Sequence, residues 1–128
     1  MLGLGALAGP AGAVDTVRFG LRDNGDLLAL CSTPPADPDY TAAINFCHGV
    51  AMGFVRYDDA LAESPEFTPM YCLPDRLTPN QLVEAYVRYA KEHPKYDRES
   101  IGDVMVKFLT DTYPCAKTGA SEAPKSGK

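Results

Sequence analysis

Residues 38–62 read PDYTAAINFCHGVAMGFVRYDDALA, and this stretch decides the fold. Its apolar side chains recur at steps of three and four, which places them on one side of an α-helix. Asp37 is the expected N-cap, and Pro38 suits the first helical position. The pattern predicts one long helix over residues 38–62 with a buried stripe of Tyr40, Ala43, Ile44, Cys47, Val50, Ala51, Phe54 and Leu61.

Two glycines interrupt this helix, Gly49 and Gly53, and their spacing of four places them on a shared face. A glycine inside a helix costs about 1 kcal/mol relative to alanine. We expect this cost to be offset by another segment of backbone that packs closely against the two glycines.

Two further helices are expected downstream. Residues 63–77 contain three prolines and Cys72, which predicts an irregular loop. Thr78 then caps a helix in which Gln81 reaches back to the cap, and His93-Pro94 ends it. Asp97 is expected to cap a last helix that stops at Tyr113-Pro114-Cys115. The expected apolar faces are Leu82, Val83, Tyr86, Val87 and Ala90 in the first of these helices, and Ile101, Val104, Met105, Phe108, Leu109 and Thr112 in the second.

Upstream of the long helix, Val17, Phe19 and Leu21 alternate with other residues, which predicts a short extended lead-in. Asn24 can cap a short helix that ends near Cys31. The sum is an all-α fold: a small bundle of three main helices plus a short N-terminal helix.

The two ends of the chain differ from this body in composition. Residues 1–13 contain only Met, Leu, Gly, Ala and Pro and finish with Ala11-Gly12-Ala13, which predicts a signal-peptide remnant that lacks its basic start. Residues 116–128 are Lys-rich and contain no large apolar side chain, which predicts a disordered tail. The helical domain is therefore expected over residues 14–115.

Charge and hydropathy exclude several classes of function. The net charge of −5 argues against nucleic acid and anionic lipid as partners, because both require a basic face. No apolar run reaches the roughly 20 residues that span a bilayer, so the mature protein is not expected to contain a transmembrane helix. An acidic body suits a protein partner with a basic surface.

The four cysteines, Cys31, Cys47, Cys72 and Cys115, form no close pair of the kind that binds zinc. In an exported chain two disulfides are expected, and three pairings are possible. We favour Cys31–Cys47 with Cys72–Cys115, because antiparallel packing of the last two helices returns Cys115 to the start of the third. The alternative is four buried thiols in a cytosolic protein.

The sequence predicts no enzyme. Cys47 and His48 are adjacent, and helical neighbours point about 100° apart, so they do not form a dyad. Asp58 and Asp59 diverge for the same reason. No hydrolase, zinc or phosphate-loop motif occurs, and we expect no cofactor and no metal.

An ordered set of motifs resembles a known family, the Tai type, which comprises the type VI secretion amidase immunity proteins and their relatives. The motifs are NGDLLALC (24–31), CHGVAMG (47–53), CLP (72–74), LTPNQL (77–82), HP (93–94) and YPC (113–115). The chain departs from the family at Val50, where an aromatic residue is usual. The resemblance implies a small periplasmic, disulfide-linked helical protein that binds and inhibits a peptidoglycan amidase effector.

An inhibitor of this kind needs a protruding element with a few large side chains. The expected partner interface is Tyr57, Asp58, Asp59, Glu63, Phe67 and Tyr71, near Met70. The alternative is that these aromatic residues cover the core beneath a long loop. Two other functions stay open, a housekeeping envelope protein and an acid-stress periplasmic chaperone, and so does a homodimer.

Overall fold

The computed structural model describes residues 13–116 of the 128-residue chain. The expected signal remnant and Lys-rich tail lie almost wholly outside these residues. The described part is all-α and contains no strand, as predicted. Its elements in chain order are the 3₁₀ helix η1 (Thr16–Gly20), α1 (Asn24–Cys31), α2 (Tyr40–Leu61), α3 (Pro79–Glu92), the 3₁₀ helix η2 (Pro94–Tyr96) and α4 (Ile101–Thr112).

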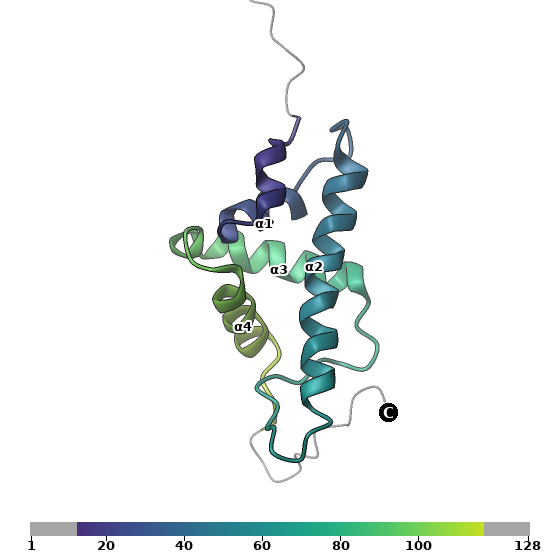
Figure 1. The fold of residues 1–128 in the computed structure, drawn as a ribbon, viewed down its shortest axis with the longest axis vertical. Coiled ribbons are helices and arrows are strands. Elements are labelled where there is room, and N and C mark those ends of the chain that lie inside the picture. Colours follow the sequence, from purple (N-terminus) through teal and green to yellow (C-terminus); the bar gives the residue numbers. More distant parts are fainter. Residues whose placement is uncertain (1–12, 117–128) are drawn as a thin grey trace, which may run out of the picture.

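The helix α2 runs along the longest dimension of the molecule, and α3 crosses it (Figure 1). The short helix α1 packs against α2, α3 and α4, and α4 also packs against α3. The loop that follows α2 lies at the opposite end from α1 (Figure 1). Among the described helices, none combines the length and the hydropathy that a bilayer crossing requires.

The predicted start of α3 is confirmed as a full capping box. The Thr78 hydroxyl accepts a hydrogen bond from the backbone N–H of Gln81 at 3.1 Å. The Gln81 side chain in turn accepts from the Thr78 N–H at 2.9 Å. These two bonds satisfy donors that a helix start otherwise leaves unpaired.

The N-terminal lead-in is not extended, and this prediction was wrong. Thr16–Gly20 form a 3₁₀ helix, because the Asp15 side chain accepts from the Val17 N–H and turns the chain. The cap of α1 is Asp23, whose carboxylate accepts from the Asp26 N–H at 3.1 Å. Asn24, expected as the cap, is the first helical residue and is fully buried.

The helix α2 begins two residues later than expected, at Tyr40. The Asp37 carboxylate accepts hydrogen bonds from the backbone N–H groups of Asp39 and Val14, both at 2.8 Å. It therefore ties the loop to the N-terminal segment instead of capping a helix at Pro38.

The cap of α4 is also corrected, from Asp97 to Ser100. The Ser100 hydroxyl accepts from the Asp103 N–H at 3.2 Å. Asp97 uses its backbone carbonyl for another contact, as acceptor from the Gly25 N–H at 2.8 Å. Asp97 lies at the end of η2, three residues before the cap of α4.

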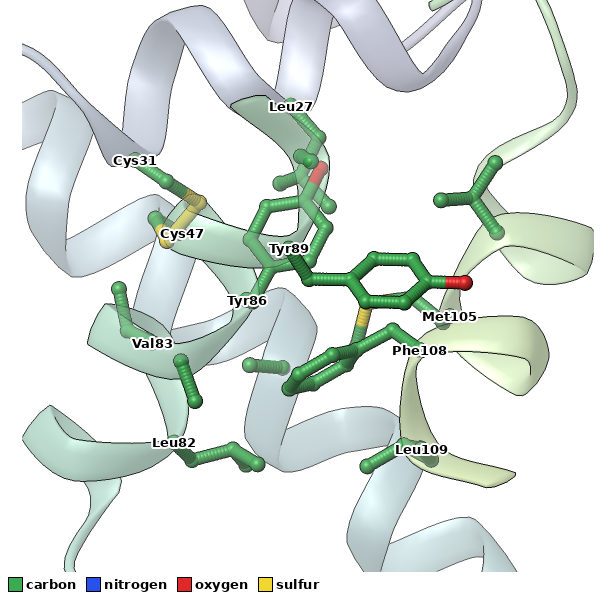
Figure 2. Packing of buried hydrophobic residues seen from close by; sticks show 14 of the residues in the cluster. Leu27, Cys31, Cys47, Leu82, Val83, Tyr86, Tyr89, Met105, Phe108 and Leu109 are labelled. Carbon is green, nitrogen blue, oxygen red and sulfur yellow. A yellow bond between two sulfur atoms is a disulfide. The ribbon is translucent and has the colours of Figure 1, made fainter. Parts of the chain in front are cut away.

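The core lies where α3 meets α4 and α2. Tyr86 and Tyr89 of α3 face Phe108 of α4, with ring centroids 5.7 Å and 5.5 Å from that of Phe108 (Figure 2). The buried apolar residues of α2 are Ala43, Cys47, Ala51 and Val55. Leu61, expected in the buried stripe, is 38% exposed because α2 continues beyond the core after Val55.

The expected backbone approach at Gly49 and Gly53 is wrong. A Cβ atom built at either position meets no atom within 4 Å, and both residues are exposed. Their helix face is open to solvent.

The favoured cysteine pairing is confirmed. Cys31–Cys47 joins α1 to α2, with 6% and 0% of these residues exposed. Cys72–Cys115 joins the loop after α2 to the residues that follow α4, and both cysteines are half-buried. All four cysteines of the chain are therefore oxidised.

Candidate protein-binding surface

The last turn of α2 and the loop after it form an exposed acidic segment, residues 57–70. It contains four carboxylates, Asp58, Asp59, Glu63 and Glu66, and no basic residue. All of its residues except Asp58 and Phe67 are exposed. The segment begins where the buried stripe of α2 ends, at Val55, so it extends past the core.

Large apolar side chains are exposed within this segment. Tyr57 is 68% exposed and Met70 is 52% exposed, against 38% for Leu61. Tyr57 and Leu61 are four residues apart in α2 and therefore share a face. Aromatic residues on such surfaces contribute a large share of binding energy in protein complexes. Leu61 was missed as a surface residue because the helical pattern continues past the point where the core stops.

The carboxylates of the segment differ in their surroundings. Burial raises the pKa of the Asp58 carboxyl, and the nearby Tyr71 hydroxyl partly offsets this rise. Asp59 accepts a hydrogen bond from the Arg56 guanidinium at 3.1 Å, in a solvent-exposed pair. Glu63 is exposed. Phe67 is half-buried in the loop.

Tyr71 is placed differently from the other expected interface residues. It is only 7% exposed and belongs to the core cluster. Burial, followed by the charge of Asp58, raises the pKa of its hydroxyl. The alternative that loop aromatics cover the core therefore describes Tyr71, whereas Tyr57 is open to solvent.

A groove of about 700 Å³ lies between α2 and α3 on another side of the molecule. Tyr40, Ile44 and His48 line it from α2, and Val87 and Arg88 line it from α3. The sulfur of Cys47, the neighbour of His48, is bonded to Cys31 and is not a thiolate nucleophile. The groove combines an apolar floor with charges of both signs, so it selects no ligand class.

A second hollow, of about 770 Å³, lies beside α1 and is lined by Arg18 and Arg22. Both guanidiniums already donate to the buried carboxylate of Asp26, at 2.8 Å and 3.0 Å. The hydrogen bond from Arg22, against the opposing effect of burial, holds the pKa of Asp26 well below its usual range. These charges stabilise the fold. Within residues 13–116 no three His, Cys, Asp or Glu residues gather as metal ligands would.

The molecule is thus a small helical domain, cross-linked by two disulfides, whose most exposed aromatic side chain stands among carboxylates. This build places the chain among small all-α domains that disulfides stabilise. A model of the Rap1a immunity proteins matches residues 23–115, which is most of the chain, and the chain belongs to that family. No curated protein and no solved structure matches it. The resemblance to immunity proteins is confirmed at this level, and the Tai type stays a prediction.

Proposed function

We propose that this protein is a periplasmic immunity protein that binds a peptidoglycan amidase delivered by type VI secretion and blocks the active site of that enzyme. Membership of the Rap1a immunity proteins over residues 23–115 carries the proposal. The same membership favours this function over a housekeeping or chaperone role, because an immunity protein acts by binding one toxic partner.

The oxidised cysteines support the periplasm as the compartment. Disulfides form and persist in oxidising surroundings such as the periplasm, and reducing systems remove them in the cytosol. Here both pairs are formed, and the Cys31–Cys47 pair is built into the core.

The acidic segment is the proposed interface, with Tyr57, Asp58, Asp59, Glu63 and Phe67 as contacts. Tyr57 supplies an exposed aromatic ring at the edge of the molecule. The surrounding carboxylates favour a partner with basic residues around its cleft and accelerate the encounter with it. Tyr71 lies beneath the segment and supports it from the core.

The proposal predicts that a reading frame beside the gene for this protein encodes a cell-wall hydrolase, and the purified product of that frame is the partner used in the test. Addition of an equimolar amount of this protein is expected to abolish release of peptidoglycan fragments. The same proteins are expected to form a stable complex by calorimetry. Undiminished hydrolysis at a several-fold excess of this protein would contradict the proposed function.

A double variant tests the interface itself. Tyr57→Ala with Met70→Ala should weaken binding at least tenfold, or about 1.4 kcal/mol. Thermal unfolding should stay within about 1 °C, because both side chains are exposed. Val17→Ala is the matched control, since Val17 is 52% exposed on η1, away from the acidic segment. Equal affinity of the double variant and the control would remove the segment from the interface.

A further inference from the structure

We infer that the Cys72–Cys115 disulfide is a positioning device for the acidic segment, which it holds in the shape that the protein partner binds. The inference rests on the proposed function. It assigns to this disulfide a role in affinity that is separate from the stability that any cross-link provides.

The first step concerns how the segment is attached. At its start, residues 57–61 belong to α2 and are held by helical hydrogen bonds. Beyond Leu61 the backbone bonds are local, such as Ser64 N–H to Leu61 O at 2.9 Å and Phe67 N–H to Ser64 O at 3.1 Å. Such bonds shape short turns, but they do not fix the loop against the body of the protein.

The second step concerns where the loop returns to the body. Tyr71 enters the core, and the next residue is Cys72. The Cys72 N–H donates to the Tyr113 carbonyl at 2.8 Å, and its sulfur is bonded to Cys115. Within residues 13–116, residues 62–64 donate back to the end of α2, and the Cys72 bond is the one backbone hydrogen bond that joins residues 65–77 to a segment outside the loop. The far end of the segment is therefore anchored at two adjacent residues, by the buried ring of Tyr71 and by the bonds of Cys72.

The third step concerns the other side of that anchor. The Tyr113 N–H donates to the Leu109 carbonyl at 2.9 Å and closes the end of α4. The Tyr113 ring packs edge-on against Phe108, with centroids 6.0 Å apart. Cys72 is thus bonded to a stretch of chain that the core itself holds in place.

The two disulfides differ in what their removal leaves behind. Cys31–Cys47 lies inside the core and joins two helices that also pack directly against each other. Cys72–Cys115 lies outside the helices, half-buried, next to the buried Tyr71 at the anchored end of the loop. Loss of the second pair should release the loop while α1, α2 and α3 keep their packing.

The first arm of the test needs no partner. Cys72→Ser/Cys115→Ser and wild type are digested under native conditions with a glutamate-specific protease, which can cut at Glu63 and Glu66. We expect cleavage at these sites to be at least tenfold faster in the variant. The rate should be independent of urea below the unfolding transition, which indicates local opening and not global unfolding.

Leu30→Ala is the matched control, because Leu30 is fully buried in α1 and lies far from the loop along the chain. This variant loses stability without touching the anchor, so its cleavage rate at Glu63 and Glu66 should equal that of wild type. Unchanged cleavage in the double serine variant would overturn the inference. So would a double serine variant that is unfolded at 25 °C by circular dichroism, since the pair would then hold the fold and not the segment.

The second arm measures affinity for the cell-wall hydrolase that the proposed function predicts beside this gene. The double serine variant should bind at least tenfold more weakly than wild type, and Leu30→Ala should bind as wild type does. If wild type itself does not bind, the proposed function fails, and the protease arm alone decides whether the disulfide holds the segment. If wild type and the double serine variant bind equally, the proposed function stands and the inference is wrong.

Discussion

The end of the molecule around α1 and the acidic segment lie far apart along its long axis and are held in opposite ways (Figure 1). At the α1 end, the N–H groups of Asn24 and Gly25 donate to the carbonyls of Glu99 and Asp97, at 2.9 Å and 2.8 Å. The hydroxyl of Tyr86 donates to the Asn24 side chain at 2.6 Å. The acidic segment is held at its far end by the buried ring of Tyr71, one backbone bond and one disulfide. The molecule is thus rigidly cross-linked at one end and sparsely anchored at the end proposed to bind.

The contacts at the α1 end explain why the motif NGD occurs at residues 24–26. Asn24 is buried and bonded to Tyr86, Gly25 lies against the chain at Asp97, and the Asp26 carboxylate is fully buried between two guanidiniums. The role of this motif is therefore to stabilise the fold. The proposed contacts lie in a stretch where the resemblance offers no motif at all, between residues 53 and 72.

The largest expected effect is at the α1 end. Asp26→Ala removes the side-chain hydrogen bonds from Arg18 and Arg22 and a bond from the Arg22 backbone, at 2.9 Å. The free energy of unfolding should fall by about 3 kcal/mol, because bonds to a buried charge are worth more than neutral ones. Urea denaturation of the variant and of wild type measures this difference in unfolding free energy.

The control for this prediction is the ion pair at the other end. Asp59→Ala breaks the exposed Arg56–Asp59 pair, and its cost should stay below about 0.5 kcal/mol. A similar loss in both variants would contradict the contrast between the two ends.

The pH dependence sharpens the same prediction. The folded state lowers the pKa of Asp26 below the value of about 3.9 expected for the unfolded chain. The stability from Asp26 is therefore fully present above about pH 4 and is lost as the pH falls toward the folded pKa. Between pH 4 and pH 2 the unfolding free energy of wild type should fall more steeply than that of Asp26→Ala.

Much of the fold could be predicted because its signals are local. The capping box of Thr78 and Gln81 depends on residues three apart, and the sequence predicts it in full. The cap at Asp97 was mispredicted because α4 begins later, after Ser100. The cap at Asn24 was mispredicted because a long-range partner, Tyr86, bonds its side chain and buries it. A local pattern does not contain such contacts.

The candidate surface shows the same limit. Charge and aromatic content indicate the stretch from Tyr57 to Tyr71, but they do not separate these two tyrosines, which are 68% and 7% exposed. That separation depends on where α2 leaves the core, after Val55, and on the anchor at Cys72. Both are properties of the packed molecule.

A smaller effect is expected at Gly25. A Cβ atom there would lie 3.3 Å from both the Asp97 carbonyl oxygen and the capping oxygen of Asp23. Gly25→Ala should therefore cost about 1 kcal/mol, although alanine is normally the better helix former by a similar amount. The unfolding temperature of Gly25→Ala, compared with that of wild type, shows whether the substitution lowers or raises stability. A rise would mean that the loop at Asp97 yields easily and that the α1 end is less rigid than its contacts indicate.

The smallest effect has the opposite sign and lies in α2, on the way to the acidic segment. Gly49 and Gly53 each have open space where a Cβ would stand, in the interior of a helix. Gly49→Ala and Gly53→Ala should each raise the free energy of unfolding by about 0.5 to 1 kcal/mol, since alanine has less backbone freedom to lose. Chemical denaturation of the two variants, with Gly25→Ala measured alongside, compares a glycine that the fold requires with two that it does not. A loss of stability in Gly49→Ala or Gly53→Ala would show that a Cβ atom on this face of α2 is not tolerated. Close packing around a glycine would then not be confined to the α1 end.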